Sequence, residues 1–292
     1  MAIQSIDNLI SAISAGQTAR YDWNKITGAS AYTAGRWYDT SLLAGLPIAN
    51  AWAGTALNWR TCDEATGNGT QIFGIPHGGN VSANIKHLLN MSAWSTAATG
   101  VPGTLMLVDL QGYWPGISNN TTSAQTLVGT PSLRYANGAG CRLYWVQTAA
   151  AGATAQNIAL SYTDQSGNTG NTLPVTVAMT ASGIVGHISH AGVAANNYGP
   201  FLPLASGDTG VQNVASVTFS AANTGTGALC LARPLAQITL SVVGLMTEKD
   251  LLNQIPSLPQ VKDGACLVWL YGAGAATAAS TTFAGGLEFV HG

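Results

Sequence analysis

Two histidines spaced three residues apart are the first feature of this chain that could do chemistry. His187 and His190 would face the same side of a helix, where two imidazoles can hold a metal ion. The surrounding run, residues 183–189, instead has the pattern of a strand, in which positions three apart point to opposite faces. No third ligand-type residue lies nearby in the sequence. We therefore expect two structural histidines and no metal site.

A second candidate is a Gly/Thr-rich loop that carries Cys62, Asp63 and Glu64. Glycoside hydrolysis needs two carboxyls roughly 5–9 Å apart across a groove. A thiol nucleophile needs a base, for which His77 or His87 is the nearest choice. Nothing beyond proximity in the sequence marks either arrangement, so we expect no catalytic residue here.

Phosphate-binding and nucleophile signatures are missing from the chain. The glycine pairs Gly67/Gly69 and Gly225/Gly227 lack the strand–loop–helix setting and the third glycine of a dinucleotide fingerprint. The sequence contains no Gly-Lys-Ser/Thr and no Gly-x-Ser-x-Gly. We expect no cofactor and no enzymatic activity.

Scarcity of charge is the strongest compositional signal. Only 8% of the 292 residues are charged, ten Lys+Arg and 12 Asp+Glu, against roughly 25% in an ordinary soluble domain. The surface must then be made of uncharged polar residues or be covered by other protein. Scattered cations offer no phosphate-neutralising face, so we expect no nucleic-acid partner. Association should rest on apolar and uncharged contacts and be nearly insensitive to salt.

The N-terminus has no basic region and carries Asp7 where a signal peptide would be apolar. We therefore expect no signal peptide and synthesis in the cytoplasm. The most apolar uncharged stretch, residues 264–287, opens with a seven-residue burst that is too short for a membrane helix, so we expect no membrane span. The cysteines at 62, 141, 230 and 266 are expected to be reduced and buried.

Residues 1–16 are predicted to form an amphipathic helix that Gly16 ends. Its apolar positions recur at three- and four-residue spacing, at Ile3, Ile6, Leu9, Ile10 and Ile13. A helix this short is marginal alone. Its stripe must therefore dock either on the core of its own domain or on a neighbouring subunit.

Residues 17–128 form a loop-rich region that holds six of the eight tryptophans and is punctuated by Gly and Pro. Within it, 104–110 has the pattern of a buried strand and 82–91 that of a short helix. Tryptophans scattered on loops either fill a core or anchor an interface, and the sequence does not decide between the two.

Residues 129–292 carry a regular β signal. Short alternating runs are separated by Gly/Asn turns, with Asn137-Gly138 marking a hairpin and 247–254 a short helix. The predicted strands are 133–135, 141–145, 158–162, 175–179, 211–220, 228–232, 238–243, 265–271 and 287–290. We expect a mainly β protein, an antiparallel β-sandwich of jelly-roll-like type. The boundary near 128 is a change in sequence pattern, and no linker marks it. The alternative to two separate regions is therefore a single core shared by 17–292.

Two polar runs carry a resemblance to a known class. Residues 160–170 (LSYTDQSGNTG) and 201–211 (FLPLASGDTGV), with the Ala/Gly/Thr texture of the chain, resemble virion structural proteins of tailed bacteriophages. In particular, the chain is similar to β-sandwich head proteins that decorate or cement a capsid. The resemblance implies a virion location, many copies and no catalysis, and it assigns no functional residue.

We therefore expect a non-enzymatic capsid decoration or cement protein, made in the host cytoplasm. It would stabilise the phage head through contacts with the major capsid protein and with copies of itself, as a homo-oligomer. The alternatives are a tail or fibre module that binds glycans or a receptor and, third, a cell-wall hydrolase. The candidate interface residues are Ile3, Ile6, Ile10, Ile13, Trp23 and Trp37.

Overall fold

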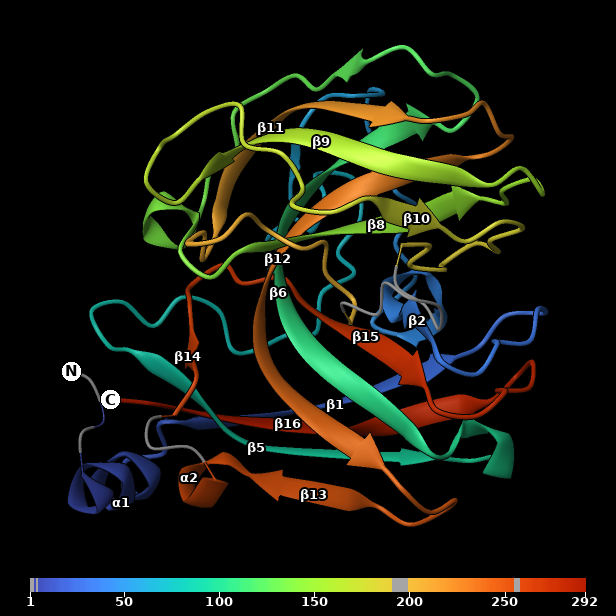
Figure 1. The fold of residues 1–292 in the computed structure, drawn as a ribbon. Coiled ribbons are helices and arrows are strands. Elements are labelled where there is room, and N and C mark those ends of the chain that lie inside the picture. The colour runs from blue at the N-terminus through green and yellow to red at the C-terminus, as the bar shows by residue number, and fades with distance from the viewer. Residues whose placement is uncertain (1–2, 4, 191–198, 255–257) are drawn as a thin grey trace.

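Three antiparallel sheets build the fold of the computed structural model, which describes residues 3, 5–190, 199–254 and 258–292 (Figure 1). All pairings between named strands are antiparallel. The predicted mainly β, sandwich-like fold with a short N-terminal helix is thus confirmed. We call the three sheets basal, central and upper, after their places in Figure 1.

The basal sheet has six strands, and the last strand of the chain lies in its middle. Across the sheet they are β13 (Thr247–Asp250), β5 (Lys86–Ser95), β16 (Thr282–His291), β1 (Thr18–Ile26) and β3 (Ala44–Leu46), with β14 (Gln260–Val261) also paired to β5. Its inner face packs against the lower half of the central sheet, where Trp23 and Phe289 share a buried cluster with Leu107.

The central sheet also has six strands and forms the spine of the molecule. They are β2 (Arg36–Asp39), β15 (Leu267–Ala273), β6 (Gly103–Ser118), β12 (Thr226–Leu240) and β8 (Arg142–Ala149), with β4 (Arg60–Thr61) paired to β6. β6 and β12 run alongside each other over their full length. The runs predicted at 228–232 and 238–243 as two strands belong to the single strand β12, because bulges let it bend without breaking its pairing with β6.

The upper sheet has four strands and covers the upper ends of β6, β8 and β12. They are β10 (Val177–Met179), β9 (Gln156–Asp164), β11 (Val211–Phe219) and β7 (Gln125–Thr126). Leu160 and Phe219 from this sheet share a second buried cluster with Trp145 and Leu229 of the central sheet. A third cluster fills a further part of the central sheet, where connection residues such as Phe73 pack on its strands.

Strands from the predicted ranges 17–128 and 129–292 lie side by side in all three sheets. β1 pairs with β16 and β6 pairs with β12 along their lengths. The first two buried clusters likewise combine side chains from both ranges. The two ranges therefore contribute to the same cores.

Three local predictions were wrong, each because tertiary pairing overrides local pattern. Residues 82–91 were predicted as a helix, but they lead into β5, which pairs with β16 and β13. The predicted helix 247–254 is instead the edge strand β13 followed by the single turn α2 (Leu251–Gln254). The hairpin predicted at Asn137-Gly138 does not form, because 133–135 is not a strand and the two residues lie in a 3₁₀ turn, η3 (Ala136–Gly138). Two further 3₁₀ turns are η1 (Thr40–Leu42) and η2 (Ala98–Gly100).

The N-terminal helix is confirmed, but α1 spans Ile6–Ser14 rather than the predicted residues 1–16, so Ile3 lies before it. The Ser5 hydroxyl caps it by accepting the Asn8 N–H at 3.1 Å. Gly16 follows the C-cap with a φ of 70°, a conformation that favours glycine. No helix in the described part of the chain is long and apolar enough to cross a membrane.

Candidate functional site

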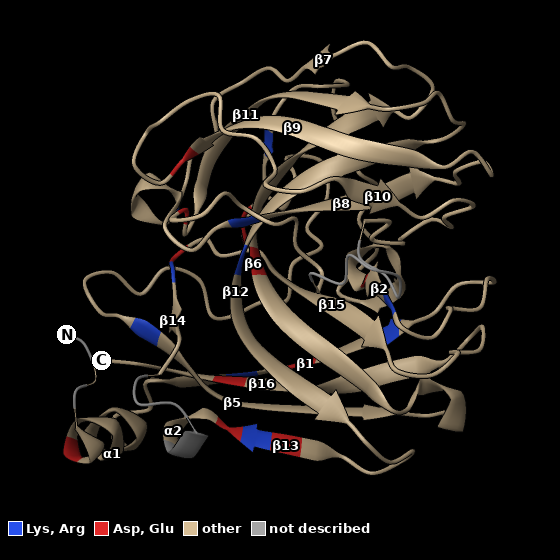
Figure 2. Cartoon of the chain, in the orientation of Figure 1, with Lys and Arg blue, Asp and Glu red and all other residues tan. Residues whose placement is uncertain are grey.

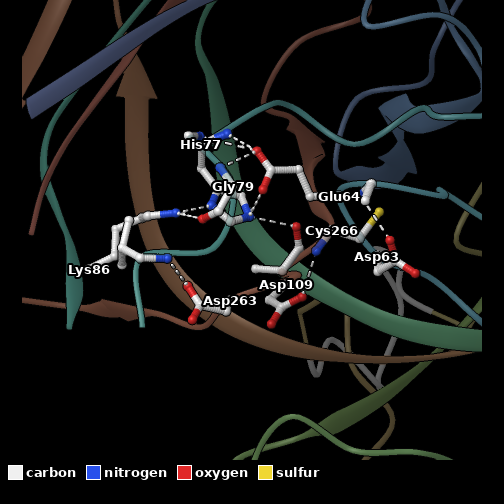
Figure 3. Close-up of polar contacts among 12 residues, drawn as sticks. Asp63, Glu64, His77, Gly79, Lys86, Asp109, Asp263 and Cys266 are labelled. Atoms are coloured by element: carbon white, nitrogen blue, oxygen red, sulfur yellow. Dashed lines mark hydrogen bonds and ion pairs between the residues drawn. The ribbon is translucent and has the colours of Figure 1, made fainter. Parts of the chain in front are cut away.

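The loop that carries Asp63 and Glu64 contacts a short nest of backbone N–H groups formed by residues 77–79 (Figure 3). Glu64 Oε1 accepts hydrogen bonds from the backbone N–H groups of His77, Gly78 and Gly79 at 2.7, 3.1 and 3.2 Å. Successive N–H groups of this kind form a concavity that binds an anion. Glu64 fills that concavity, so this part of the sequence carries its own bound carboxylate.

Asp63, the other carboxylate of the loop, has a separate role. Its oxygens accept hydrogen bonds from the backbone of Ala65 and Thr66 and from the Thr66 hydroxyl. Although burial acts to raise it, these hydrogen bonds hold the pKa of Asp63 below its usual value. Asp63 stabilises its own turn while Glu64 binds the nest, so the two carboxylates do not work as a pair.

His77 is fully buried and both of its ring nitrogens have partners. Nε2 lies 2.9 Å from the carbonyl oxygen of Ala265 and 3.2 Å from Glu64 Oε2, while Nδ1 lies 2.7 Å from Lys86 Nζ. A carbonyl oxygen only accepts, so Nε2 carries the proton and Nδ1 accepts from the ammonium. Burial and the charge of Lys86 lower the pKa of His77, which keeps the ring neutral.

Lys86 completes the cluster from β5. Its side chain is 2% exposed, and its ammonium donates to His77 and to the carbonyl oxygen of Gly79. Burial lowers the pKa of Lys86, while the carboxylates of Glu64 and Asp263 act to raise it. The polar atoms of Glu64, His77 and Lys86 thus contact one another and the backbone. These contacts join the loop to β5 and to the carbonyl oxygen of Ala265.

The thiol candidate Cys62 does not have a base. Both nitrogens of His77 are taken by other groups, and Nδ1 of His87 lies 3.2 Å from the carbonyl oxygen of Leu258. Cys62 is buried beside Cys266, and burial raises the pKa of its thiol well above the usual value. A buried neutral thiol is a poor nucleophile. All four cysteines are buried and free, as the sequence predicts.

His187 and His190 are both buried. The strand predicted at 183–189 does not form, because His187 makes only an isolated β-bridge to Tyr38 and the segment is a connection. The His187 ring stacks on the Tyr38 ring with centroids 5.2 Å apart. His190 Nδ1 accepts the Trp145 N–H at 3.3 Å, and Nε2 donates to the carbonyl oxygen of Pro200 at 3.1 Å. Burial lowers the pKa of each imidazole to about 3.

No group of three or more His, Cys, Asp or Glu side chains in the described ranges is placed to hold a metal ion. Lys25 shows the same structural use of charge as Lys86. Its ammonium donates to the carbonyl oxygens of Leu43 and Pro47 at 3.2 and 2.6 Å, and burial lowers its pKa to about 8. The buried charges described here hold connections in place.

The candidate interface residues on α1 divide into two sets. Ile3 is half-buried and packs with the buried Leu9 and Ala12 against Val290 of β16. The other isoleucines stay exposed, Ile6 by 64%, Ile10 by 56% and Ile13 by 46%. At positions i, i+4 and i+7 they form one ridge along the helix. We call Ile6, Ile10 and Ile13 the isoleucine ridge.

The isoleucine ridge borders the outer face of the basal sheet, the face turned away from the central sheet (Figure 1). A groove of about 340 Å³ lies between α1 and the sheet, lined by Ile13, Leu89 and Phe289 together with Arg20 and Glu288. Neighbouring positions on this face are polar. Across the strands Asp22, Gly286, Ser92 and Glu248 lie opposite one another, and directly opposite residues share a face.

The two candidate tryptophans do not lie on the open surface. Trp23 is 2% exposed and its ring contacts that of Trp269, with centroids 5.1 Å apart. Trp37 is half-buried on β2 directly opposite Gly272, over which its indole lies. Trp23 belongs to the core, because the inner face of β1 meets the central sheet there. All eight tryptophans are described, and none is exposed.

Comparisons with known proteins add little. No protein-family model and no curated protein matches the chain. Solved structures give a weak resemblance to viral capsid structures. The structure of infectious bursal disease virus Gt strain is 12% identical over 94% of this chain and 80% of that chain, with a TM-score of 0.19. The VP2 subviral particle of the same virus, with the same identity and coverage, has a TM-score of 0.17. Scores this low support no specific function.

Proposed function

We propose that this chain is a non-enzymatic structural protein of a phage virion, a decoration or cement protein of the head. It attaches through α1 and the outer face of the basal sheet to the major capsid protein and to copies of itself. The observation that carries the proposal is the gathering of exposed apolar side chains around this one sheet.

The exposed large apolar residues are unevenly distributed. They lie on α1, on strands of the basal sheet or in segments joined directly to those strands: Ile6, Ile10, Ile13, Ile26, Leu46, Ile48, Val242, Val243, Leu245, Met246 and Leu252. Among the described residues only Ile72, Val128, Val175 and Val185 are exposed elsewhere. A gathering of this kind marks an interaction surface.

Repetition strengthens a contact of this size. Fully burying one isoleucine contributes about 1.5–3 kcal/mol. The isoleucine ridge, with about half of each side chain exposed, would contribute about 3–4 kcal/mol to each attachment. That is modest for an isolated pair, but a lattice presents many copies, and contacts made together on one assembly gain from effective concentration.

The tryptophans favour this function over the glycan-binding alternative. A glycan-binding module of a tail fibre stacks sugars on exposed aromatic rings. Here the indole rings pack on one another instead, as Trp59 does on Trp114 with centroids 4.6 Å apart. The aromatic content of the N-terminal half therefore serves the cores of the molecule.

Replacing the isoleucine ridge tests the proposal. The variant Ile6→Ala/Ile10→Ala/Ile13→Ala keeps the helix, since alanine has the higher helix propensity, and removes most of the apolar surface that the isoleucine ridge exposes. We expect attachment to purified phage heads, or self-association measured by sedimentation velocity, to weaken by about 100-fold or more. Circular dichroism should stay unchanged.

A matched control removes apolar surface elsewhere. Ile72→Ala/Val128→Ala/Val175→Ala changes three exposed residues away from the basal sheet and should attach like the original chain. Equal attachment by the ridge variant, or an equal loss in the control, would contradict the assignment of this face. Because the isoleucine ridge is uncharged, attachment through it should persist in about 1 M NaCl.

A further inference from the structure

A pocket lined by cations lies outside the surface assigned to attachment. It has a volume of about 570 Å³ and forms where β12, the segment 134–139 and residues 259–262 meet. Arg134, Arg233 and Lys262 line it, and no carboxylate of the described residues does. The chain has only ten Lys and Arg residues, which Figure 2 shows in blue along the ribbon. Three of the ten line this one pocket.

The guanidinium of Arg134 contacts buried groups of the chain, so the charges open to the pocket are those of the other two cations. Its guanidinium forms an ion pair with the buried Asp109 and also donates to the carbonyl oxygens of Cys62 and Leu110. The charge of Arg134 is therefore balanced within the chain. The open positive charge of the pocket comes from Arg233 and Lys262.

Arg233 is held in one position. Its Nη1 donates to the carbonyl oxygen of Ala139 at 2.6 Å, and Cζ lies 4.3 Å from the centroid of the Tyr135 ring. Gly140 makes room for it, since a Cβ there would lie 3.1 Å from Nη1. Nε and Nη2 of Arg233 donate to no described residue, so two donors of a fixed guanidinium stay available.

Lys262 adds a second charge at the same pocket. Among the described residues its side chain has no hydrogen bond or ion pair. The adjacent Asp263 accepts the Val81 N–H at 3.0 Å and does not line the pocket. Nothing in the described surroundings therefore neutralises Lys262.

We propose that this pocket is an oxyanion-binding site that takes a carboxylate or a phosphate group. The planar guanidinium of Arg233 matches two oxygens of either group, and Lys262 supplies a point charge. Pro234, Leu235 and Pro259 give the pocket apolar walls, which suits an anion carried on a larger molecule. The site is independent of the proposed attachment through α1.

Calorimetric titration of the full chain at low ionic strength tests the site, with inorganic phosphate and succinate as probes. We expect at least one probe to bind, and Arg233→Met and Lys262→Met each to raise its dissociation constant by about tenfold or more. The probe that binds more tightly identifies the oxyanion source. Binding of neither probe would overturn the proposal.

Two further variants keep the result interpretable. Arg20→Met removes an exposed arginine on the basal sheet and should leave binding unchanged. Lys262 makes no described contact that folding needs, so Lys262→Met reports on the site even where Arg233→Met is unstable. Binding that is undiminished in Lys262→Met, or lost equally in Arg20→Met, would show that the pocket is not the site.

Discussion

Acidification from pH 6.5 to pH 5 should lower the free energy of unfolding by about 3 kcal/mol through His187 and His190 alone. In the folded chain each imidazole has a pKa of about 3 because it is buried, whereas an unfolded histidine has a pKa of about 6.5. Below pH 6.5 the unfolded state binds more protons, so stability falls as the pH falls. Well below pH 6.5 each histidine accounts for about 1.4 kcal/mol per pH unit until the pH approaches 3, and at pH 6.5 for about half of that.

Denaturant unfolding followed across this pH range measures the effect. His187→Phe keeps the ring stacked on Tyr38, and His190→Gln keeps an acceptor for the Trp145 N–H and a donor for the carbonyl oxygen of Pro200. Each variant removes one of the two titrating histidines, so each should remove about half of the pH dependence that the pair gives to the free energy of unfolding. His291→Gln, at the end of β16, is the matched control. Unchanged slopes in both test variants would contradict the assigned pKa values.

Arg134→Met should destabilise the chain by about 3–5 kcal/mol, since it leaves a buried carboxylate without its partner. Asp109 is fully buried, and its Oδ2 accepts from Arg134 Nε at 3.1 Å. After the substitution the Cys266 N–H, at 3.0 Å from Oδ1, stays as a donor to this carboxylate. The free energy of unfolding from a urea titration gives the loss.

Two companions separate the buried pair from a general effect of charge. Arg134→Met/Asp109→Asn removes both charges and should recover part of the lost stability. Arg20→Met removes an arginine that forms an exposed ion pair with Glu288 at 2.7 Å, and it should leave the free energy of unfolding nearly unchanged. If Arg134→Met lowered the free energy of unfolding no more than Arg20→Met does, the buried Arg134–Asp109 pair would not be a main source of stability.

The β architecture was predictable because burial and alternation leave a local record. Ile158, Leu160 and Tyr162 of β9 alternate with less buried neighbours and lie in the second buried cluster. The helix predicted at 82–91 was wrong because Leu88 and Leu89 are adjacent in a strand with a bulge opposite β16, which imitates helical spacing. Pairing of β1 with β16, separated by most of the chain, leaves no local trace at all.

The chemistry-bearing residues were harder to place. Proximity in sequence offered only His77 or His87 as a base for Cys62 and gave no sign that His77 contacts Glu64 and Lys86, as it does in the structure. The isoleucine spacing predicted α1 correctly, but not that Leu9 would be buried while Ile6 and Ile10 stay exposed. That division depends on which strand the helix meets, and the helix sequence does not record it.

Quantitative mass spectrometry of purified virions tests the central claim most directly. The measurement is the copy number of this chain relative to the major capsid protein. A head decoration or cement protein repeats with the lattice, so we expect on the order of hundreds of copies per virion. Absence from the virion, or a few to a few dozen copies as in a tail or connector, would contradict the proposed function.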